Sequence, residues 1–356
     1  MSNGSLPSNP FVAAGMIEDC RLFFGREDEL HGIASRMVGV QPTSINIVGD
    51  QRIGKSSLLY HFWLTWEQRV QDSSRFAVIY LSLRKDDCQT EMGLYLAVAE
   101  GLESSVSGWR NWAKNALKGK QLNRQGFSDL IKRWKQQGKL PVLCLDDFER
   151  LLNYPQEFDN GFYDNLRSLM EDNALMLVIA SRKKLAIYGS EFRFVSGFFN
   201  IGHSIDLQEL TTDEAIKLVR LSSGSINSVP VLSIDEQNYA QQWGKRHPYK
   251  LQLAGYYLLE ARQQGKSIKW AKQQFENQLA NFQPNSKKRR WRWVHWVVWD
   301  MPVRLGSFTK FIGASVGEVT NWVMGVGILL LVILVFAGVL HWDDVRKYVF
   351  DKLGIK

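Results

Sequence analysis

The chain of 356 residues contains little cysteine and histidine, and neither residue occurs at a metal-binding spacing. Its three cysteines, Cys20, Cys88 and Cys144, lie far apart, and so sparse and odd a set argues against the disulfide framework of a secreted protein. The six histidines form no H-x-x-H pair and no C-x-x-C occurs, so the sequence does not indicate a zinc site. The first residues, MSNGSLPSNP, lack a basic start followed by an apolar run, so we expect no signal peptide.

Glycine and proline are not in excess, and no repeat with a period of about 20–50 residues is present. The composition therefore excludes a wholly disordered chain, a collagen-like fibre and an array of structural repeats. With 45% hydrophobic residues, the chain is long enough for about two domains with a substantial core.

Excess positive charge is scarce in most of the chain and gathers at its C-terminal end. The net charge is +8, but residues 284–356 alone hold 11 Lys or Arg against 5 Asp or Glu. Six of the 13 tryptophans also lie in this segment. A near-neutral body argues against a nucleic-acid-binding surface, whereas a basic, tryptophan-rich tail favours a membrane surface.

The C-terminal segment also holds the strongest apolar run, Val323–Leu340, with 18 residues and no charge. At about 1.5 Å per residue, a helix of this length approaches the thickness of a bilayer core, about 30 Å. Trp322 and Trp342 flank the run, and a basic cluster that starts at Lys287 precedes it. We therefore expect a single-pass C-terminal membrane anchor, with the N-terminal body in the cytoplasm. A buried core helix is the alternative, but a soluble helix normally carries a polar stripe.

A nucleotide-binding motif follows the short apolar run Ser44–Val48, which is a strand candidate. The complete pattern G-x-x-x-x-G-K-[ST] is formed by Gly49, Asp50, Gln51, Arg52, Ile53, Gly54, Lys55 and Ser56, and Ser57 continues into a helical segment. Glycines let backbone N–H groups face the phosphates, and the helix N-terminus adds its dipole. Lys55 would contact the β- and γ-phosphates, and the Ser56 hydroxyl would bind Mg²⁺. The strand before the motif and the helix after it favour nucleotide binding over a chance match.

The apolar run Leu140–Leu145 ends in a cluster of acidic residues, which is the Walker B arrangement. Asp146 would hold Mg²⁺ through its water shell, and Asp147 would polarise the attacking water. Asp147 stands where a glutamate is often found, so Glu149 is an alternative base. The competing interpretation is a strand end whose acidic residues are merely solvated.

A further strand candidate, Leu175–Ala180, ends in Ser181 and Arg182. Arg182 would sense the γ-phosphate, because a guanidinium pairs with phosphate in a bidentate way, and a surface cation is the alternative. Together with Phe76–Leu83, these apolar strands alternate with helical patterns. The pattern predicts an α/β fold of the P-loop NTPase type, with a parallel sheet flanked by helices.

The segment Phe24–Leu30, FGREDEL, resembles the opening motif of STAND NTPases and related AAA+ ATPases. The stretches VLCLDDFERL and LVIASR are similar to the Walker B and sensor-1 strands of those proteins. The resemblance implies that Gly25 and Arg26 line the adenine end of the site. It also implies that residues 205–219 open a helical lid domain and that Pro248 approaches the base.

The chain departs from STAND proteins in lacking their long sensor repeats and a separate effector domain. Asp147 in place of glutamate is the other departure, and it bears on the rate of hydrolysis. The preference for ATP over GTP rests on the resemblance alone. Independently of it, Thr212 followed by Asp213 and Glu214 is expected to cap a helix.

Six segments follow from these features. We expect a flexible leader over 1–20, a P-loop NTPase domain over 21–204, a helical lid over 205–283, a basic tryptophan-rich linker over 284–322, a transmembrane helix over 323–340 and a short tail over 341–356.

These features favour a membrane-anchored STAND-like ATPase that acts as a nucleotide-dependent switch. It would assemble and then signal or act at the membrane, and defence is one such role. Its cofactors would be ATP and Mg²⁺. Its partners would be membrane lipid, an unidentified protein and, in the ATP state, further copies of the chain. An AAA+ ATPase that handles DNA, as origin-recognition or transposition regulators do, stays open, although nucleic acid is the less expected partner. A non-catalytic nucleotide-binding membrane scaffold also stays open, and a P-loop small-molecule kinase is a weaker option because nothing marks an acceptor-binding lid.

Overall fold

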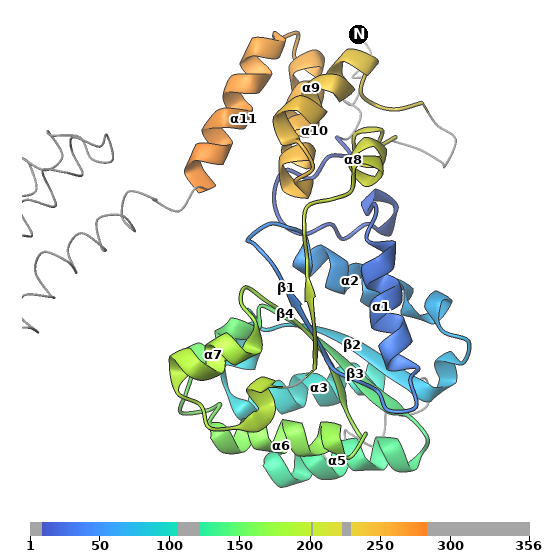
Figure 1. Ribbon diagram of the computed structural model, residues 1–356, viewed down its shortest axis with the longest axis vertical. Coiled ribbons are helices and arrows are strands. Elements are labelled where there is room, and N and C mark those ends of the chain that lie inside the picture. The colour runs from blue at the N-terminus through green and yellow to red at the C-terminus, as the bar shows by residue number, and fades with distance from the viewer. Residues whose placement is uncertain (1–8, 106–121, 201, 223–228, 283–356) are drawn as a thin grey trace, which may run out of the picture. The chain divides into compact units, whose positions relative to one another are not determined.

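The computed structural model describes residues 9–105, 122–200, 202–222 and 229–282. The chain divides into two compact units, and the first, Met1–Glu276, contains a β-sheet, the helices around it and further helices after it (Figure 1). The predicted span Val323–Leu340 and the basic linker before it lie outside the described residues. Within the described ranges, no helix combines the length and the apolar character that crossing a bilayer requires.

The described residues form a five-stranded parallel sheet in the order β2-β3-β4-β1-β5. Its strands are β1 (Ile45–Val48), β2 (Phe76–Ser82), β3 (Leu140–Asp146), β4 (Met176–Ser181) and β5 (His203–Asp206). Strands β1 to β4 are buried along almost their whole length, which explains why their sequences are continuous apolar runs. The expected α/β fold with a parallel sheet is confirmed.

Helices cover both faces of the sheet (Figure 1). One face carries α1 (Glu27–Met37) and α2 (Lys55–Thr65), and the other carries α3 (Glu91–Ser105), α5 (Arg124–Gln136) and α6 (Asn160–Glu171). Helix α7 (Leu185–Phe192) follows β4. Short 3-10 helices are η1 (Cys20–Leu22), η2 (Trp66–Arg69), η3 (Ser73–Arg75), η4 (Asp86–Gln89), η5 (Phe148–Asn153) and η6 (Gly197–Asn200).

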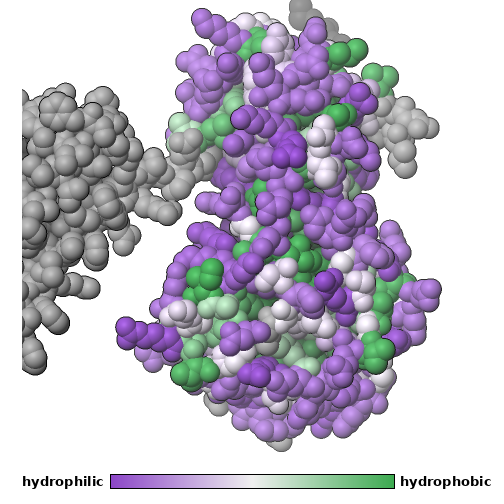
Figure 2. All heavy atoms as spheres, viewed as in Figure 1, coloured by the Kyte–Doolittle hydropathy of each residue, from purple (hydrophilic) through white to green (hydrophobic). Residues whose placement is uncertain are grey.

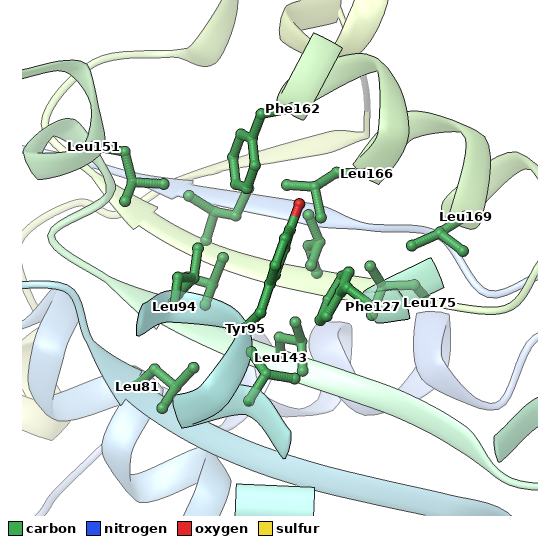
Figure 3. Packing of buried hydrophobic residues seen from close by; sticks show 14 of the residues in the cluster. Leu81, Leu94, Tyr95, Phe127, Leu143, Leu151, Phe162, Leu166, Leu169 and Leu175 are labelled. Carbon is green, nitrogen blue, oxygen red and sulfur yellow. The ribbon is translucent and has the colours of Figure 1, made fainter. Parts of the chain in front are cut away.

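Side chains of the central strands alternate between two cores. In β3, Leu143 and Leu145 belong to the cluster beneath α3, α5 and α6, whereas Val142 and Cys144 belong to the cluster beneath α1 and α2. Figure 3 shows the first cluster around Tyr95. Each fully buried leucine stabilises the fold by about 1.5–3 kcal/mol relative to an exposed one, so the sheet is a firm support for the loops at its edge. The face shown in Figure 2 is mainly hydrophilic, as expected when the apolar side chains fill these cores.

Strand β5 was not expected, because the sequence placed the start of the lid at residue 205. Its residues are mostly exposed, so no apolar run marks it. Backbone pairing with β1 forms it, with Ile45 in register with His203 and Val48 in register with Asp206. The sheet therefore extends to Asp206, and the first helix after it begins at Thr212.

The part after the sheet, called the lid, contains α8 (Thr212–Val219), α9 (Ile234–Gly244), α10 (Pro248–Gln263) and α11 (Ile268–Phe282). Helices α8, α9 and α10 pack against one another. Capping boxes start α8 and α9, and Pro248 occupies the first turn of α10. The cap of α8 is Thr211 and not the expected Thr212, because Glu214 returns a hydrogen bond only to the residue three places before it.

Residues 9–17 are called the N-terminal strap, and the start of the strap packs on α10. The Phe11 side chain is 2% exposed and lies so close to Gly255 that a Cβ there would come within 2.5 Å of the phenyl ring. The N–H of Val12 donates to Oε1 of Gln252 at 2.9 Å. The sequence suggested a flexible leader over 1–20, whereas in the structure the chain from Asn9 onward is held by these contacts.

Candidate functional site

The carboxyl ends of β1, β3 and β4 meet at one edge of the sheet, where a cavity of about 480 Å³ lies between the sheet and the lid. In α/β folds the loops after the strands gather at this edge, and ligands bind there. The walls come from the strap, the P-loop (Gly49–Ser56), the ends of β2, β3 and β4, and the first turns of α10. Segments far apart in the sequence thus share one cavity.

Two glycines set the shape of the P-loop. A Cβ on Gly49 would lie 2.8 Å from the carbonyl oxygen of Leu207, so a larger residue does not fit there. Gly54 has φ +102° in open space, a conformation that residues with side chains rarely adopt. Helix α2 begins at Lys55, so its unpaired N–H groups and its dipole are directed at the loop. The loop therefore has the shape and the partial positive charge of an anion-binding site.

Lys55 folds back onto the P-loop. Its Nζ donates to the carbonyl oxygens of Gly49 at 2.7 Å and Asp50 at 2.8 Å. Burial lowers the pKa of Lys55, and the nearby carboxylates, Glu149 foremost, oppose that shift. The lysine thus has a defined position, and a phosphate in the cavity would compete with two loop carbonyls for its ammonium group.

Asp146, at the end of β3, is 5% exposed and accepts two hydroxyl hydrogen bonds. Ser56 Oγ donates to Oδ1 at 3.0 Å, and the Tyr80 hydroxyl donates to Oδ2 at 3.1 Å. Burial raises the pKa of Asp146 and the adjacent Asp147 raises it further, while both hydroxyls act in the opposite direction. Oxygen ligands are those that Mg²⁺ prefers, and here they come from the P-loop and β3 within hydrogen-bonding reach. Ser56 and Asp146 therefore fit the predicted Mg²⁺ site.

Asp147 is held in an ion pair that the sequence did not indicate. Its backbone has φ +57°, a left-handed conformation that aspartate tolerates better than most residues. The carboxylate accepts Nε and Nη2 of Arg84 at 2.5 and 3.0 Å. The Asp147 side chain is 13% exposed and that of Arg84 is 60% exposed. Arg84 therefore pairs with the same carboxylate that the sequence predicts will polarise the attacking water.

Glu149 and Arg182, both predicted for catalysis, contact each other. Nε of Arg182 lies 2.9 Å from Oε1 of Glu149. The other carboxylate oxygen of Glu149 is buried and accepts no hydrogen bond within the described part of the chain. Both residues line the cavity, so the guanidinium and the second carboxylate oxygen are in place for a bound group.

The strap and the lid contact the P-loop and its helix directly. The Arg52 guanidinium lies 4.2 Å from the centre of the Tyr249 ring, a cation–π contact between the loop and α10. The N–H of Ile17 donates to Oγ of Ser57 at 3.0 Å. Pro248, beside Tyr249, also lines the cavity. The position of the lid is therefore coupled to the conformation of the P-loop.

Arg26 and Gly25 sit between the P-loop and the lid. Arg26 is 5% exposed, and its Nη2 donates to the carbonyl oxygens of Ile53 at 3.3 Å and Gln208 at 2.5 Å. Gly25 lies against the Glu214 side chain. Burial alone would raise the pKa of Glu214, but hydrogen bonds from the backbone N–H groups of Arg26 and Thr211 bring it below its ordinary value. This pair thus contacts protein groups at the lid junction.

The structure brings most of the predicted site residues together. The cavity is lined by Arg26, Gln51, Arg52, Ile53, Gly54, Lys55, Ser56, Ser57, Asp146, Asp147, Glu149, Arg182 and Pro248. Gly25, Gly49 and Asp50 do not line it, although the last two hold Lys55 through their carbonyls. The roles assigned to these residues in binding and catalysis stay predictions.

Sequence reasoning missed Tyr80, Arg84 and the strap residues Met16 and Ile17, which all line the cavity. Arg84 carried a usable signal, because it directly follows the apolar run of β2 and therefore falls at the same sheet edge as Asp146. Tyr80 lies inside an apolar run, so its position in the sequence indicates a core residue. The strap shows no pattern that distinguishes it from a loop.

The model of the Novel STAND NTPase 1 family matches residues 13–223, more than half of the 356 residues. The chain belongs to the Novel STAND NTPase 1 family. The matched region includes the P-loop, the sheet and α8. No curated protein matches the chain.

Solved structures of P-loop ATPases are similar to this Novel STAND NTPase 1 member. A Walker-type ATPase of Pyrococcus abyssi is 14% identical with a TM-score of 0.51, and the match covers 86% of this chain and 89% of that one. The ORC2 protein of Aeropyrum pernix, in ADPNP–ADP complexes, is 14% identical with a TM-score of 0.55, and the match covers 96% and 91% of the two chains. At this identity the likeness establishes the fold alone.

Proposed function

We propose that this chain is a nucleotide-dependent switch that binds ATP with Mg²⁺, hydrolyses ATP slowly and assembles in its ATP state. One observation carries the proposal: the P-loop cavity is lined by the sheet and by the lid, so a nucleotide there would contact both. A ligand shifts a conformational equilibrium only by as much as its contacts differ between the two states. A cavity shared by two parts supplies such contacts.

The chain's own groups supply the binding. The N–H groups of the P-loop and of the start of α2 would face the phosphates, and the Lys55 ammonium would transfer from its carbonyl partners to phosphate oxygens. Ser56 and Asp146 would hold Mg²⁺, which when bound neutralises charge on the phosphates. The choice of ATP rests on the family.

Hydrolysis would use the acidic residues after β3. Asp147 would accept a hydrogen bond from the attacking water once Arg84 leaves its carboxylate. Arg182 would contact the γ-phosphate, and Glu149 would hold the guanidinium in place. Because the ion pair between Arg84 and Asp147 must open before Asp147 can act on the water, we expect slow turnover.

Assembly is tested by the mass of the full chain in a mild detergent, measured by light scattering without nucleotide, with ADP, and with a non-hydrolysable ATP analogue plus Mg²⁺. We expect a larger mass only with the triphosphate, because its γ-phosphate is the group that distinguishes it from ADP. Lys55→Ala should stay at the nucleotide-free mass in all three conditions. A wild-type mass that is the same in every condition would show that the nucleotide does not control assembly.

We also propose that Val323–Leu340 tethers the chain to a membrane, with the P-loop domain in the cytoplasm. The support is the sequence itself: a charge-free run, flanking tryptophans and a basic cluster before it. Gathering of such tails by assembly would deliver a defence response or another signal at the membrane.

Tethering is tested by flotation with liposomes that contain anionic lipid, followed by an alkaline wash. The full chain should float and resist the wash, and a chain that lacks residues 318–356 should stay in the dense fraction, because a single span is the only segment that the sequence marks for insertion. Equal flotation of the two chains would contradict a single-span tether.

A further inference from the structure

The Arg26 side chain joins the P-loop to the segment that leaves the sheet for the lid. Its Nη2 donates to the carbonyl oxygen of Ile53 in the P-loop and to that of Gln208 just after β5. Its Nη1 donates to Oε1 of Glu29 at 3.0 Å, which fixes the guanidinium. In a trans peptide the C=O and N–H point in opposite directions, so holding the Ile53 carbonyl also directs the N–H of Gly54. Arg26 therefore orients a donor of the P-loop.

Glu214, in the first turn of α8, completes the connection. Its Oε1 accepts the backbone N–H of Arg26 at 2.6 Å, and its Oε2 accepts the backbone N–H of Thr211 at 2.7 Å. One carboxylate thus links the turn before α1 to the start of the lid, with the two bonds on different oxygens. Hydrogen bonds to an ionised carboxylate are about twice as strong as neutral ones.

Gly25, which lies beside this contact, has no space for a side chain. A Cβ on Gly25 would lie 2.5 Å from Oε1 of Glu214 and 2.7 Å from its Cδ. Gly25 also has φ +78°, where a side chain would be strained. The backbone at Gly25 and the carboxylate of Glu214 are therefore in direct contact. The start of α8 cannot move away without breaking the hydrogen bond from the Arg26 N–H.

We propose that Glu214 is a positioning residue that ties the lid to the P-loop through Arg26, and that this tie limits how fast nucleotide leaves the cavity. The proposal rests on the nucleotide-binding function proposed above. Because the tie is made by protein groups alone, it holds the lid with or without nucleotide. Release of nucleotide then requires the carboxylate to part from the Arg26 N–H.

The test compares Glu214→Ala with Thr211→Ala in the full chain. Both variants lose the capping box of α8, but only the first loses the bond to Arg26. Release of a fluorescent ADP, followed by stopped flow with excess unlabelled ADP, is expected to be about tenfold faster for Glu214→Ala. For Thr211→Ala we expect no more than about a twofold change, because the cap acts on α8 alone.

A second readout needs no nucleotide. Hydrogen exchange of the backbone amides over residues 24–30 and 207–219 should be faster in Glu214→Ala than in Thr211→Ala. If the wild type binds no nucleotide, the proposed function fails, while this exchange comparison still decides whether the tie exists. Equal exchange in the two variants would overturn the tie, and equal ADP release from two folded variants would overturn its control of release.

Discussion

Replacing Lys55 by alanine is expected to weaken the binding of ATP by about a hundredfold or more, because hydrogen bonds to charged groups are worth about 1.5–3 kcal/mol each. The Lys55 ammonium lies inside the cavity, held by the carbonyl oxygens of Gly49 and Asp50. No other lysine lines the cavity in the described part of the chain. Titration of a fluorescent ATP analogue in the presence of Mg²⁺ measures the effect.

The matched control is Lys183→Ala. Lys183 is ion-paired with Glu191 of α7 and does not line the cavity, so its loss should leave ATP affinity unchanged. Thermal unfolding of Lys183→Ala should stay near that of the wild type, because exposed ion pairs such as that of Lys183 with Glu191 contribute little to stability. The same measurement on Lys55→Ala checks that this variant is folded. Unchanged affinity in Lys55→Ala would place the nucleotide somewhere other than the P-loop.

Replacing Asp147 by asparagine should slow hydrolysis on the order of a hundredfold while ATP affinity stays within about twofold, because a general base typically contributes about 10²–10⁴-fold. Asparagine is isosteric with aspartate and also tolerates the left-handed backbone at φ +57°. The variant therefore removes the carboxylate charge without disturbing the turn. Phosphate release and ATP titration, measured on the same preparation, separate the two effects.

Glu149→Gln is the companion variant, because Glu149 is the alternative base. In the proposed mechanism Glu149 holds Arg182 in place and does not activate the water, so we expect a smaller loss of rate than in Asp147→Asn. A larger loss in Glu149→Gln would reverse the two assignments. Normal hydrolysis in both variants would exclude a carboxylate base at this strand end.

The parts of the site that the sequence predicted are those with local patterns. The P-loop and the acidic residues after β3 are contiguous motifs that follow buried apolar strands, so pattern and strand context coincide. Parallel pairing then brings Ser56 within 3.0 Å of Asp146, although 90 residues separate them. The sheet, its flanking helices and the part of the cavity lining that comes from the P-loop and the end of β3 follow from such signals.

What the sequence missed depends on contacts between distant segments. Strand β5 is mostly polar and exposed, and only its pairing with β1 makes it a strand. Arg26 and Glu214 are 188 residues apart, and nothing in either segment indicates that one accepts a hydrogen bond from the other. The cap of α8, in contrast, could have been predicted from the sequence. Thr211 and Glu214 stand at the spacing of a capping box, which identifies Thr211 as the cap.

The contact between the strap and α10 has a consequence for synthesis of the chain. Val12 and Gln252 are 240 residues apart, and Asn9 and Tyr256 are 247 apart, so the ribosome must make almost the whole described region before the start of the strap can dock on α10. The sheet is complete at Asp206. At about 5–20 residues per second, about 2.5–10 seconds pass between that point and Tyr256. During this interval the lid has not yet covered the P-loop. A newly synthesised chain is therefore expected to bind its first nucleotide before the lid closes the cavity.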